Sequence, residues 1–386
     1  MGWYRLTWPK AILAFLIDLV GYVLFGPFKL IRAFIPGGSR PFTPARILLL
    51  RLDHMGDVLM ATPAMLALRR SFPKARIYVA VKKNNCPLIS LPGVVDEIVS
   101  LTPWWTVAPG EERDSWPRLW RKTGELRQER FDLGIDLKGD LRNILLLFLT
   151  GSRRRLSYGI RGGGFLLTEM VKFHPGPRHE VDRNLDLIRV LVGEIDRLPP
   201  RYEVGPEEER EVKIKLEKIF TPGEKLIGIH PGANSSSKIW PAACFAKLID
   251  KIKEEGLGRV IIFGGPKEKE ILRELKLSLK SAPLILDNLS LKGLAAFFKE
   301  LDLFIGNDSG PFHLAEAVGT TVVTIFGSTF SDIVGPVSPE SQVVKSRRFC
   351  APCRRPGERE RCVRNDCLRD ISVEEVYEVI QKRLRL

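Results

Sequence analysis

Several familiar signatures are missing from this 386-residue chain, and each absence narrows its possible functions. Six cysteines are too few for a disulfide scaffold of this size, so we infer a reducing compartment. No G-x-G-x-x-G follows the first expected strand, which removes the main support for a nicotinamide-dependent dehydrogenase. The G-x-x-x-x-G-K-[ST] spacing of a P-loop is absent, and no short repeat period is evident.

The composition is that of a globular protein with a large excess of positive charge. Hydrophobic residues make up 44% and charged residues 27%, and the length predicts two domains. The net charge of +14 attracts polyanions such as nucleic acid, anionic lipid, nucleotides or phosphorylated glycans. A solvated basic surface without a dedicated partner is the alternative, because net charge does not identify a ligand.

An apolar segment at residues 11–35 is close to the length that spans a bilayer. No small-x-small site closes it, which argues against a cleaved signal peptide. Asp18, Lys29 and Arg32 fall on one helical face, and Gly26-Pro27 predicts a kink or break. This pattern favours a monotopic helix in the plane of the membrane. A membrane span and a helix docked on a soluble protein remain as alternatives.

Basic residues around this segment predict the side of the membrane on which the remaining chain lies. Two precede the apolar run and five follow it, so the positive-inside rule places the rest of the chain in the cytoplasm. These residues are Arg5 and Lys10, then Lys29, Arg32, Arg40, Arg46 and Arg51.

After a Pro- and Gly-rich linker at residues 36–44, short apolar runs alternate with helical patterns. This alternation implies parallel sheets with crossover helices, so we predict an α/β fold of two doubly wound domains. We expect strands at residues 47–50, 77–81, 94–100, 131–137, 226–229, 260–263, 303–305 and 322–326. We expect helices at residues 58–71, after Arg142, and at residues 241–255, 267–279 and 311–318.

A segment rich in proline and charge at residues 198–211 predicts the boundary between the domains. The expected parts are an N-terminal apolar segment and linker, two Rossmann-like domains, and a cysteine-containing end with a helix. Their ranges are residues 1–40, 45–205, 206–345 and 346–386. The Trp- and Pro-rich residues 101–121 read as an insertion near a site mouth, and Arg153–Arg155 with Gly162–Gly164 as a flexible basic loop region.

Four stretches follow expected strands, where doubly wound domains bind their ligands. In the first, Gly56 permits a tight turn and Asp57 stands at a helix start. Asp57 is either an N-cap, a role that aspartate favours, or a general base for an acceptor hydroxyl.

The second stretch runs from His230 to Pro241 and includes Ser237, Lys238 and Trp240. Its backbone N–H groups, serine hydroxyls and single ammonium can hold a diphosphate, although an ordinary polar turn has a similar composition.

In the third stretch, Gly264 and Gly265 allow a ligand to approach the backbone, and Glu268 can accept hydrogen bonds from ribose hydroxyls. The alternative is a turn that leads into an acidic first helical turn. In the fourth, Asp308, Ser309 and Gly310 precede Pro311, a favoured first helical residue, so a helix N-terminus is presented as an anion site. His313 adds a polar group there.

Together these stretches resemble glycosyltransferase family 9, the heptosyltransferases of lipopolysaccharide inner-core synthesis. They read RLDHMGDVLMATPAMLALRRSFP, IHPGANSSSKIWP, FGGPKE and IGNDSGPFHLAEAVG, and the resemblance covers residue 46 to the C-terminus. It implies a GT-B fold, in which an N-terminal acceptor domain and a C-terminal donor domain face each other across a cleft. It also implies an ADP-heptose donor, a lipid A-linked acceptor, inversion at the anomeric carbon and no catalytic metal.

The resemblance assigns roles to individual residues. Asp57 falls on the catalytic base, Lys238 on the lysine that binds donor phosphate, and Glu268 on an acidic residue near the nucleoside. Asp308, Ser309, Gly310 and His313 match the donor-binding loop, and we place Ser237, Trp240, Gly264 and Gly265 on the same side. Because the family's acceptor is phosphorylated, Gly56, Lys138 and Arg142 are expected to contact it, with Arg153–Arg155 as further candidates. A solvated basic face is the alternative for these arginines.

The implied partners are a nucleotide-sugar donor, an anionic glycolipid and the cytoplasmic face of the inner membrane, without nucleic acid. An epimerase or a transferase of another nucleotide sugar is the nearest alternative, and a non-enzymatic polyanion-binding protein is a further one. The thiols of Cys350, Cys353, Cys362 and Cys367 suggest a structural metal, free thiols or a redox-labile bridge.

Overall fold

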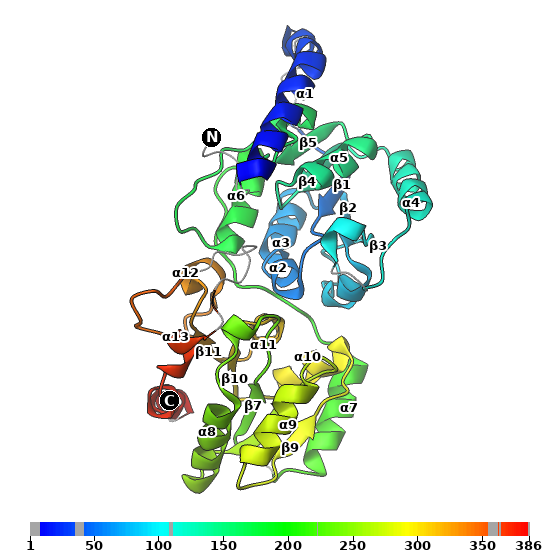
Figure 1. The fold of residues 1–386 in the computed structure, drawn as a ribbon. Helices are drawn as coiled ribbons and strands as arrows, with labels where there is room; N and C mark the ends of the chain where they lie inside the picture. Colours follow the sequence, from blue (N-terminus) through cyan, green and yellow to red (C-terminus); the bar gives the residue numbers. More distant parts are fainter. Residues whose placement is uncertain are drawn as a thin grey trace. The chain divides into compact units, whose positions relative to one another are not determined.

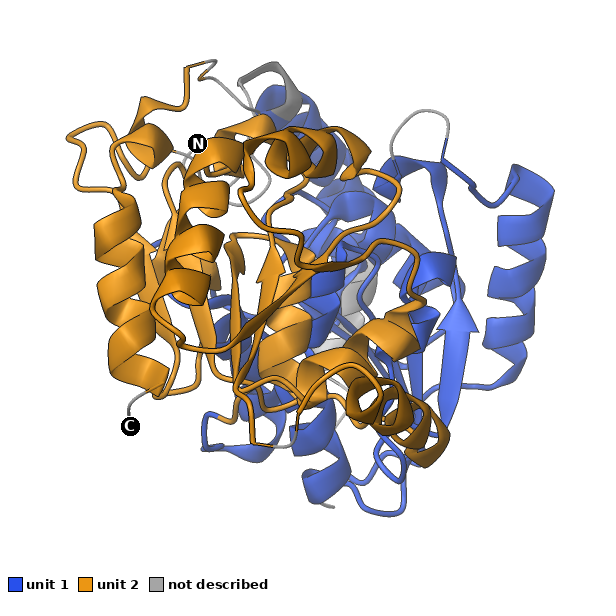
Figure 2. Cartoon of the chain, turned by 90° about the horizontal axis from the view of Figure 1, so that it is seen from below, with its two compact units in different colours: residues 1–197 blue, residues 198–386 orange. Residues whose placement is uncertain are grey.

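The computed structural model describes residues 8–34, 42–107, 111–221, 223–353, 362 and 364–384. The chain forms two compact units, Met1–Arg197 and Leu198–Leu386 (Figure 2). Residues 198–205, which we placed at the end of the first domain, belong to unit 2. Tyr202 is buried there, and its N–H donates to the carbonyl of Ala317 over 2.8 Å.

Unit 1 is built on a six-stranded parallel sheet with the strand order β3-β2-β1-β4-β5-β6. The central strand β1 is wholly buried from Ile47 to Leu50, because it pairs with β2 on one side and β4 on the other. The strands are β1 (Arg46–Leu50), β2 (Arg76–Val81), β3 (Glu97–Ser100), β4 (Leu133–Asp136), β5 (Arg154–Ser157) and β6 (Glu169–Met170).

Helices connect these strands and cover the sheet (Figure 1). The α-helices are α1 (Trp8–Phe34), α2 (Met55–Leu59), α3 (Thr62–Ser71), α4 (Trp116–Gln128), α5 (Leu141–Leu149) and α6 (Glu180–Val192). Short 3₁₀ helices are η1 (Lys83–Leu88), η2 (Trp104–Thr106) and η3 (Gly164–Leu166).

Unit 2 repeats this plan with the strand order β12-β11-β10-β7-β8-β9, again parallel throughout. The prediction of an α/β chain with two parallel sheets is therefore confirmed. The strands are β7 (Leu226–His230), β8 (Arg259–Phe263), β9 (Leu284–Leu286), β10 (Leu303–Asn307), β11 (Val322–Phe326) and β12 (Gln342–Lys345).

The C-terminal helices belong to the core of unit 2 rather than to a separate segment. Leu368, Val376 and Ile380 are fully buried in the same cluster as Trp240 and Phe245. The helices of this unit are α7 (Pro206–Glu217), η4 (Ser236–Lys238), α8 (Ala242–Glu254), α9 (Lys269–Ser278), α10 (Leu291–Lys299), α11 (Gly310–Ala317), α12 (Ser331–Val334), α13 (Asp366–Arg369) and α14 (Val373–Leu384).

Two expectations about local structure were wrong. The helix expected at residues 58–71 is two helices, because Pro63 has no N–H to continue the ladder and the Thr62 hydroxyl donates instead to the Leu59 carbonyl over 2.7 Å. The supposed basic loop contains β5, where Arg154 forms an ion pair with Glu169 at 2.6 Å.

The N-terminal helix α1 continues through Gly26-Pro27, so the predicted break is also wrong. A proline removes one intrahelical hydrogen bond but does not by itself end a helix. Among the described helices, none combines the length and hydropathy needed to cross a membrane. The linker residues 36–41 and the flanking Arg5 and Arg40 lie outside the described residues.

One narrow stripe of α1, which contains Asp18, packs on the rest of unit 1. Ala14, Asp18 and Gly21 are buried, and Asp18 Oδ1 accepts a hydrogen bond from the N–H of Gly163 over 2.7 Å. A Cβ on Gly21 would lie 2.4 Å from the Phe165 ring, so only glycine permits this approach. Most of the larger apolar side chains between Ile12 and Leu24 are left exposed.

Candidate functional site

The sheet of unit 1 has its topological switch point between β1 and β4. After β1 the chain adds its next strands on one side of the sheet, and after β4 it adds them on the other side. At such a point the loops after two neighbouring strands diverge and leave a crevice for a ligand. The loop after β1 carries Asp53 and Asp57, and the loop after β4 carries Lys138 and Arg142. The structure therefore brings together residues that are about 80 positions apart in the sequence.

Asp57 is the third residue of α2 rather than its N-cap. The N-cap is His54, and Asp57 Oδ2 accepts a hydrogen bond from the His54 backbone N–H over 3.2 Å. This is half of a capping box, which fixes the carboxylate at the start of the helix. Gly56 is buried within the same turn. The Asp57 side chain is 27% exposed, so it is held in place and still open to solvent.

A buried guanidinium fixes the geometry of this edge. Arg51 Nη2 lies 3.2 Å from Asp57 Oδ1, and its Nε lies 3.4 Å from Asp53 Oδ2. Its Nη1 donates to the Leu137 carbonyl over 3.1 Å, on the β4 loop. Glu180 of α6 completes the surroundings at 3.9 Å. One cation therefore ties the β1 loop, the β4 loop and α6 together.

Asp53 is the most strongly paired carboxylate of the site. Its burial alone would raise the pKa, but the Lys138 ammonium and the Arg51 guanidinium outweigh that effect and lower the pKa of Asp53 below its ordinary value. Lys138 donates directly to Asp53 Oδ1. The partly exposed Lys138 ammonium is thereby positioned beside the Asp57 turn.

The β4 loop is supported from beneath by Asp136, which is fully buried. Its Oδ2 accepts from the Gly139 N–H over 2.8 Å, and its Oδ1 accepts from the Asn143 amide over 3.2 Å. Burial raises the pKa of Asp136 to about 6, against the opposing effect of these hydrogen bonds. Arg142 chelates Asp140, the N-cap of α5, at 2.8 and 2.9 Å, and its side chain is half exposed.

Unit 2 has its switch point between β7 and β10. The loops after β7, β8 and β10 leave the same edge of the sheet, because these strands are adjacent and parallel. They carry Lys238, Glu268 and Asp308, respectively. Asn307, the last residue of β10, links two of the loops: its amide donates to the Pro231 carbonyl over 2.7 Å and accepts from the Trp240 N–H over 3.0 Å.

Lys238 and Asp308 form an ion pair at 2.6 Å. Asp308 is nearly buried and also accepts from the Thr329 hydroxyl over 2.6 Å, so the carboxylate is fixed from two sides. The Lys238 side chain is 22% exposed, and an ammonium has three donors. Asp308 therefore orients the ammonium and leaves it able to contact an anion.

The start of α11 lies directly after Asp308. Ser309 is the N-cap, but its side chain makes no capping hydrogen bond, and its buried Oγ has no partner among the described residues. The first N–H groups of a helix need acceptors and carry partial positive charge. Gly310 begins the helix and Pro311 follows, so the backbone is open to an anion at this end.

Glu268 lies across two glycines. A Cβ on Gly232 would come within 2.4 Å of Glu268 Cγ, and one on Gly265 within 3.1 Å of Glu268 Oε2. A Cβ on Gly264 would instead meet Leu272 at 2.6 Å. The glycines therefore allow the Glu268 carboxylate to lie flat against the β7 and β8 loops.

Three of the expected donor contacts, Trp240, His313 and Ser237, are buried in this structure. The Trp240 indole is fully buried, and its N–H donates to the Ile371 carbonyl over 3.1 Å. It joins the β7 loop to the C-terminal segment and offers no exposed atoms to a ligand. His313 and Ser237 are also buried. The Ser237 carbonyl accepts from the Ser328 hydroxyl over 3.0 Å, so this residue supports the loop through its backbone.

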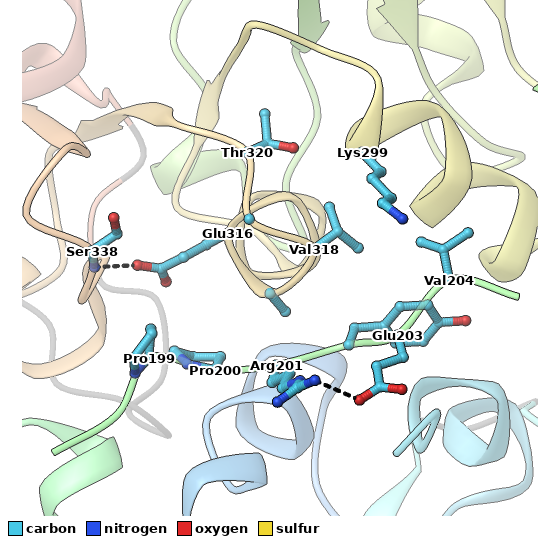
Figure 3. Close-up of a pocket in the computed structure, with 13 residues that line it drawn as sticks. Pro199, Pro200, Arg201, Glu203, Val204, Lys299, Glu316, Val318, Thr320 and Ser338 are labelled. Atoms are coloured by element: carbon cyan, nitrogen blue, oxygen red, sulfur yellow. Dashed lines mark hydrogen bonds and ion pairs between the residues drawn. The ribbon is translucent and has the colours of Figure 1, made fainter. Parts of the chain in front are cut away.

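A cavity of unit 2, about 420 Å³ in volume, lies at the other end of α11 (Figure 3). Glu316, near the C-terminus of that helix, lines it and accepts from the Ser338 N–H over 2.7 Å. Arg201 and Glu203, near the start of unit 2, also line the cavity and form an ion pair at 2.8 Å. None of the four ligand loops contributes to its lining, so we do not assign the donor to it.

The four C-terminal cysteines are free thiols in the structure. Cys367 is buried, whereas Cys350, Cys353 and Cys362 are exposed. Over the described part of the chain, no group of three or more His, Cys, Asp or Glu residues could hold a metal ion. The hypothesis of a structural metal here gains no support from the structure.

A family model described as glycosyltransferase family 9 (heptosyltransferase) matches residues 118–364. The chain belongs to glycosyltransferase family 9. The resemblance noted in its sequence is confirmed, and the protein is a glycosyltransferase.

Known members agree with this assignment. Lipopolysaccharide heptosyltransferase 3 of Escherichia coli is 24% identical over 285 residues, which are 71% of this chain and 81% of that protein. The family 9 glycosyl transferase of Veillonella parvula has the same fold, with a TM-score of 0.76, 21% identity, and coverage of 90% of this chain and 99% of that one. The ADP-heptose lps heptosyltransferase II of E. coli gives a TM-score of 0.72 at 20% identity, with coverage of 88% and 98%.

Sequence reasoning about this family 9 chain missed the residues that hold the site from behind. Arg51, Asp53 and Asp136 stand directly after or at the end of strands, and that position is the signal that could have identified them. Glu180 and Asn184 lie in α6, more than 120 positions from Arg51, and no local pattern connects them. In unit 2, Asn307 and Thr329 were missed for the same two reasons.

We predict that Arg51→Met destabilises unit 1 by about 3–5 kcal/mol, because it removes the cation beside Asp57 and leaves the buried Asp53 with Lys138 alone. Arg51→Lys keeps the charge but loses the planar fork, so its effect should be smaller. Urea unfolding followed by tryptophan fluorescence measures this, since every tryptophan except Trp240 lies in unit 1.

The matched control is Arg76→Met, which removes a half-exposed guanidinium paired with Glu97 at 2.6 Å. Its cost should stay below about 1 kcal/mol. Equal effects of the Arg51 and Arg76 variants would contradict a central role for Arg51.

The second prediction concerns pH and His230, the last residue of β7. Burial lowers the pKa of His230 from 6.5 to about 4, so the folded chain resists a proton that the unfolded chain accepts. The contribution of the neutral His230 to the free energy of unfolding is fully present above pH 6.5. It is lost as the pH falls from 6.5 to about 4, a change of about 3 kcal/mol.

In His230→Gln this contribution is absent, so the difference in unfolding free energy between wild type and variant should shrink between pH 7.5 and pH 4.5. The exposed His174 provides the control, and His174→Gln should keep the wild-type profile. A pH-independent difference for His230→Gln would show that the imidazole is not held neutral by burial.

Proposed function

We propose that this enzyme transfers a heptose from ADP-heptose, with inversion, to a phosphorylated lipid A–inner-core acceptor. The names of its relatives supply the donor and the acceptor class. The observation that carries the proposal is the Lys238–Asp308 pair beside the uncapped start of α11, at the switch point of unit 2. In this proposal the ammonium and the helix start together hold the diphosphate of the donor.

The donor is held by unit 2 in this proposal. The Lys238 ammonium and the first N–H groups of α11 contact the diphosphate, and Glu268 accepts from the ribose hydroxyls. As the bond to the anomeric carbon breaks, negative charge grows on the leaving ADP. The ammonium and the helix N-terminus offset that charge, so no divalent cation is needed for this step.

The acceptor is held by unit 1. The Asp57 carboxylate takes the proton from the acceptor hydroxyl as that oxygen attacks the anomeric carbon on the face opposite ADP. The capping hydrogen bond and Arg51 hold the carboxylate in one orientation, which reduces the entropy lost on reaching the transition state. Lys138 and Arg142 lie on the neighbouring loop and contact the acceptor's phosphate groups. A single displacement of this kind inverts the configuration.

The location follows from the acceptor. A lipid-anchored substrate stays at the membrane surface, so we place the enzyme as a peripheral or monotopic protein on the cytoplasmic face of the inner membrane, with α1 lying in its plane.

We predict selective binding of ADP over UDP, GDP and CDP in a calorimetric titration. Lys238→Ala should weaken ADP binding about 10- to 100-fold, because it removes one charge-assisted contact to the diphosphate. Lys247→Ala, which removes an exposed lysine of α8, should bind like wild type. Tighter binding of another nucleotide would be consistent with a glycosyltransferase but would contradict ADP-heptose as its donor.

We predict that Asp57→Asn lowers turnover about 10²- to 10⁴-fold while ADP affinity is unchanged. Asparagine keeps an acceptor for the His54 N–H, so the unfolding free energy should change by less than about 1 kcal/mol. Asp132→Asn is the control, because Asp132 accepts the Ala45 N–H at the opposite edge of the same sheet. Small and equal effects of both variants on turnover would contradict the assignment of Asp57 as the general base.

A further inference from the structure

Unit 1 exposes apolar side chains along three neighbouring helices. On α1, most of the large apolar residues between Ile12 and Leu24 are exposed, whereas the stripe of Ala14, Asp18 and Gly21 is buried. Exposed apolar surface on this scale usually marks an interaction site. Since the buried stripe already docks α1 on its own unit, the outer face is left for a partner.

A second apolar group lies on α4. Trp116 and Trp120 are one helical turn apart, and their side chains are 64% and 65% exposed. With Trp104 and Trp105 they line an almost wholly apolar cavity of about 120 Å³ between α4 and α5. Leu145 of α5 lines the same cavity and is exposed as well. Tryptophan combines an apolar ring with an N–H group and is enriched where bilayer meets water.

The helix α5 joins these two groups into one surface. On one flank, Phe148 packs edge-on against Phe25 of α1, with ring centroids 6.0 Å apart. On the other flank, Leu145 and Leu149 line the tryptophan cavity of α4. Figure 1 shows α5 between α1 and α4. We call the surface formed by the exposed side chains of α1, α5 and α4 the three-helix face.

The charge around the three-helix face selects its partner. The helix α4 carries four basic residues and one acidic residue, and Arg121 on it is 71% exposed. Arg155 lies over the Phe148 ring at 5.2 Å and Arg142 over the Trp105 ring at 6.0 Å. An apolar face with interfacial tryptophans and a basic fringe matches an anionic bilayer, and the net charge of +14 has the same sign.

We propose that the three-helix face docks unit 1 on an anionic phospholipid bilayer, with α1 and the Trp116–Trp120 pair as two separate contacts. Two contacts fix the orientation of the unit, whereas α1 alone would leave it free to rotate about one helix. The inference rests on the proposed function only in placing the acceptor in a membrane.

The test uses the full chain and flotation with vesicles of phosphatidylcholine, alone or mixed with phosphatidylglycerol. Wild type should bind the mixed vesicles, less so at high salt, with a blue shift of its tryptophan emission. Two double variants test the two contacts: Trp116→Ala/Trp120→Ala and Leu16→Gln/Val20→Gln. Each should reduce vesicle binding at least about tenfold, because each removes apolar surface that would otherwise be buried in the bilayer. The first pair should also abolish most of the blue shift.

The control is Leu277→Gln, which changes an 82% exposed leucine of unit 2 and should bind vesicles like wild type. Far-UV circular dichroism of every variant shows whether it is folded. An ADP titration separates the two proposals, since vesicle binding without ADP binding would reject only the proposed donor. No binding to mixed vesicles, a loss confined to one of the two pairs, or a dimer disrupted by the tryptophan variant would overturn the three-helix face.

Discussion

Parallel pairing at two switch points is the constraint on which the rest of the structure depends. β1 lies between β2 and β4, and β7 lies between β8 and β10. Because neighbouring parallel strands end at one edge, loops far apart in the sequence must meet there, and each edge collects polar groups that cannot be hidden in the sheet. In unit 1 these polar groups are mainly carboxylates, and the buried Arg51 guanidinium offsets their charge. In unit 2 they are one ion pair beside a helix start.

The two edges differ in a way that suits the two halves of one reaction. The edge of unit 1 fixes a carboxylate, since Asp57 is held by a backbone N–H on one oxygen and by a guanidinium on the other. The edge of unit 2 fixes positive groups, since Asp308 orients Lys238 and no side chain caps α11 in the described residues. A proton acceptor and an anion site are the two fixed elements that an inverting transfer from a nucleotide diphosphate requires.

Much of this fold could be predicted because its strands are short apolar runs ending in polar turns. Residues 322–326 became β11 with the same bounds. The missed strands β5 and β6 contain few apolar residues, and the pairing of Arg154 with Glu169 stabilises them instead, a contact that no local pattern reveals. For the site, position after a strand made Asp57 and Lys238 candidates, and the structure places both beside the switch points. Position after a strand could not reveal Glu180 or Thr329, because their partners come from tertiary packing, and it could not show that the Trp240 indole is buried by the C-terminal segment.

The helix α1 shows why amphipathic patterns need a structure to be interpreted. Its single acidic residue suggested a polar face turned to water or to lipid headgroups, yet Asp18 is buried and accepts the Gly163 N–H over 2.7 Å. A buried carboxylate needs such a donor, so the helix has one preferred docking orientation. That orientation leaves the apolar residues outside, where water contact is unfavourable. The same hydrogen bond that attaches α1 to the rest of unit 1 therefore determines which surface α1 exposes, and this is the surface that we propose for membrane contact.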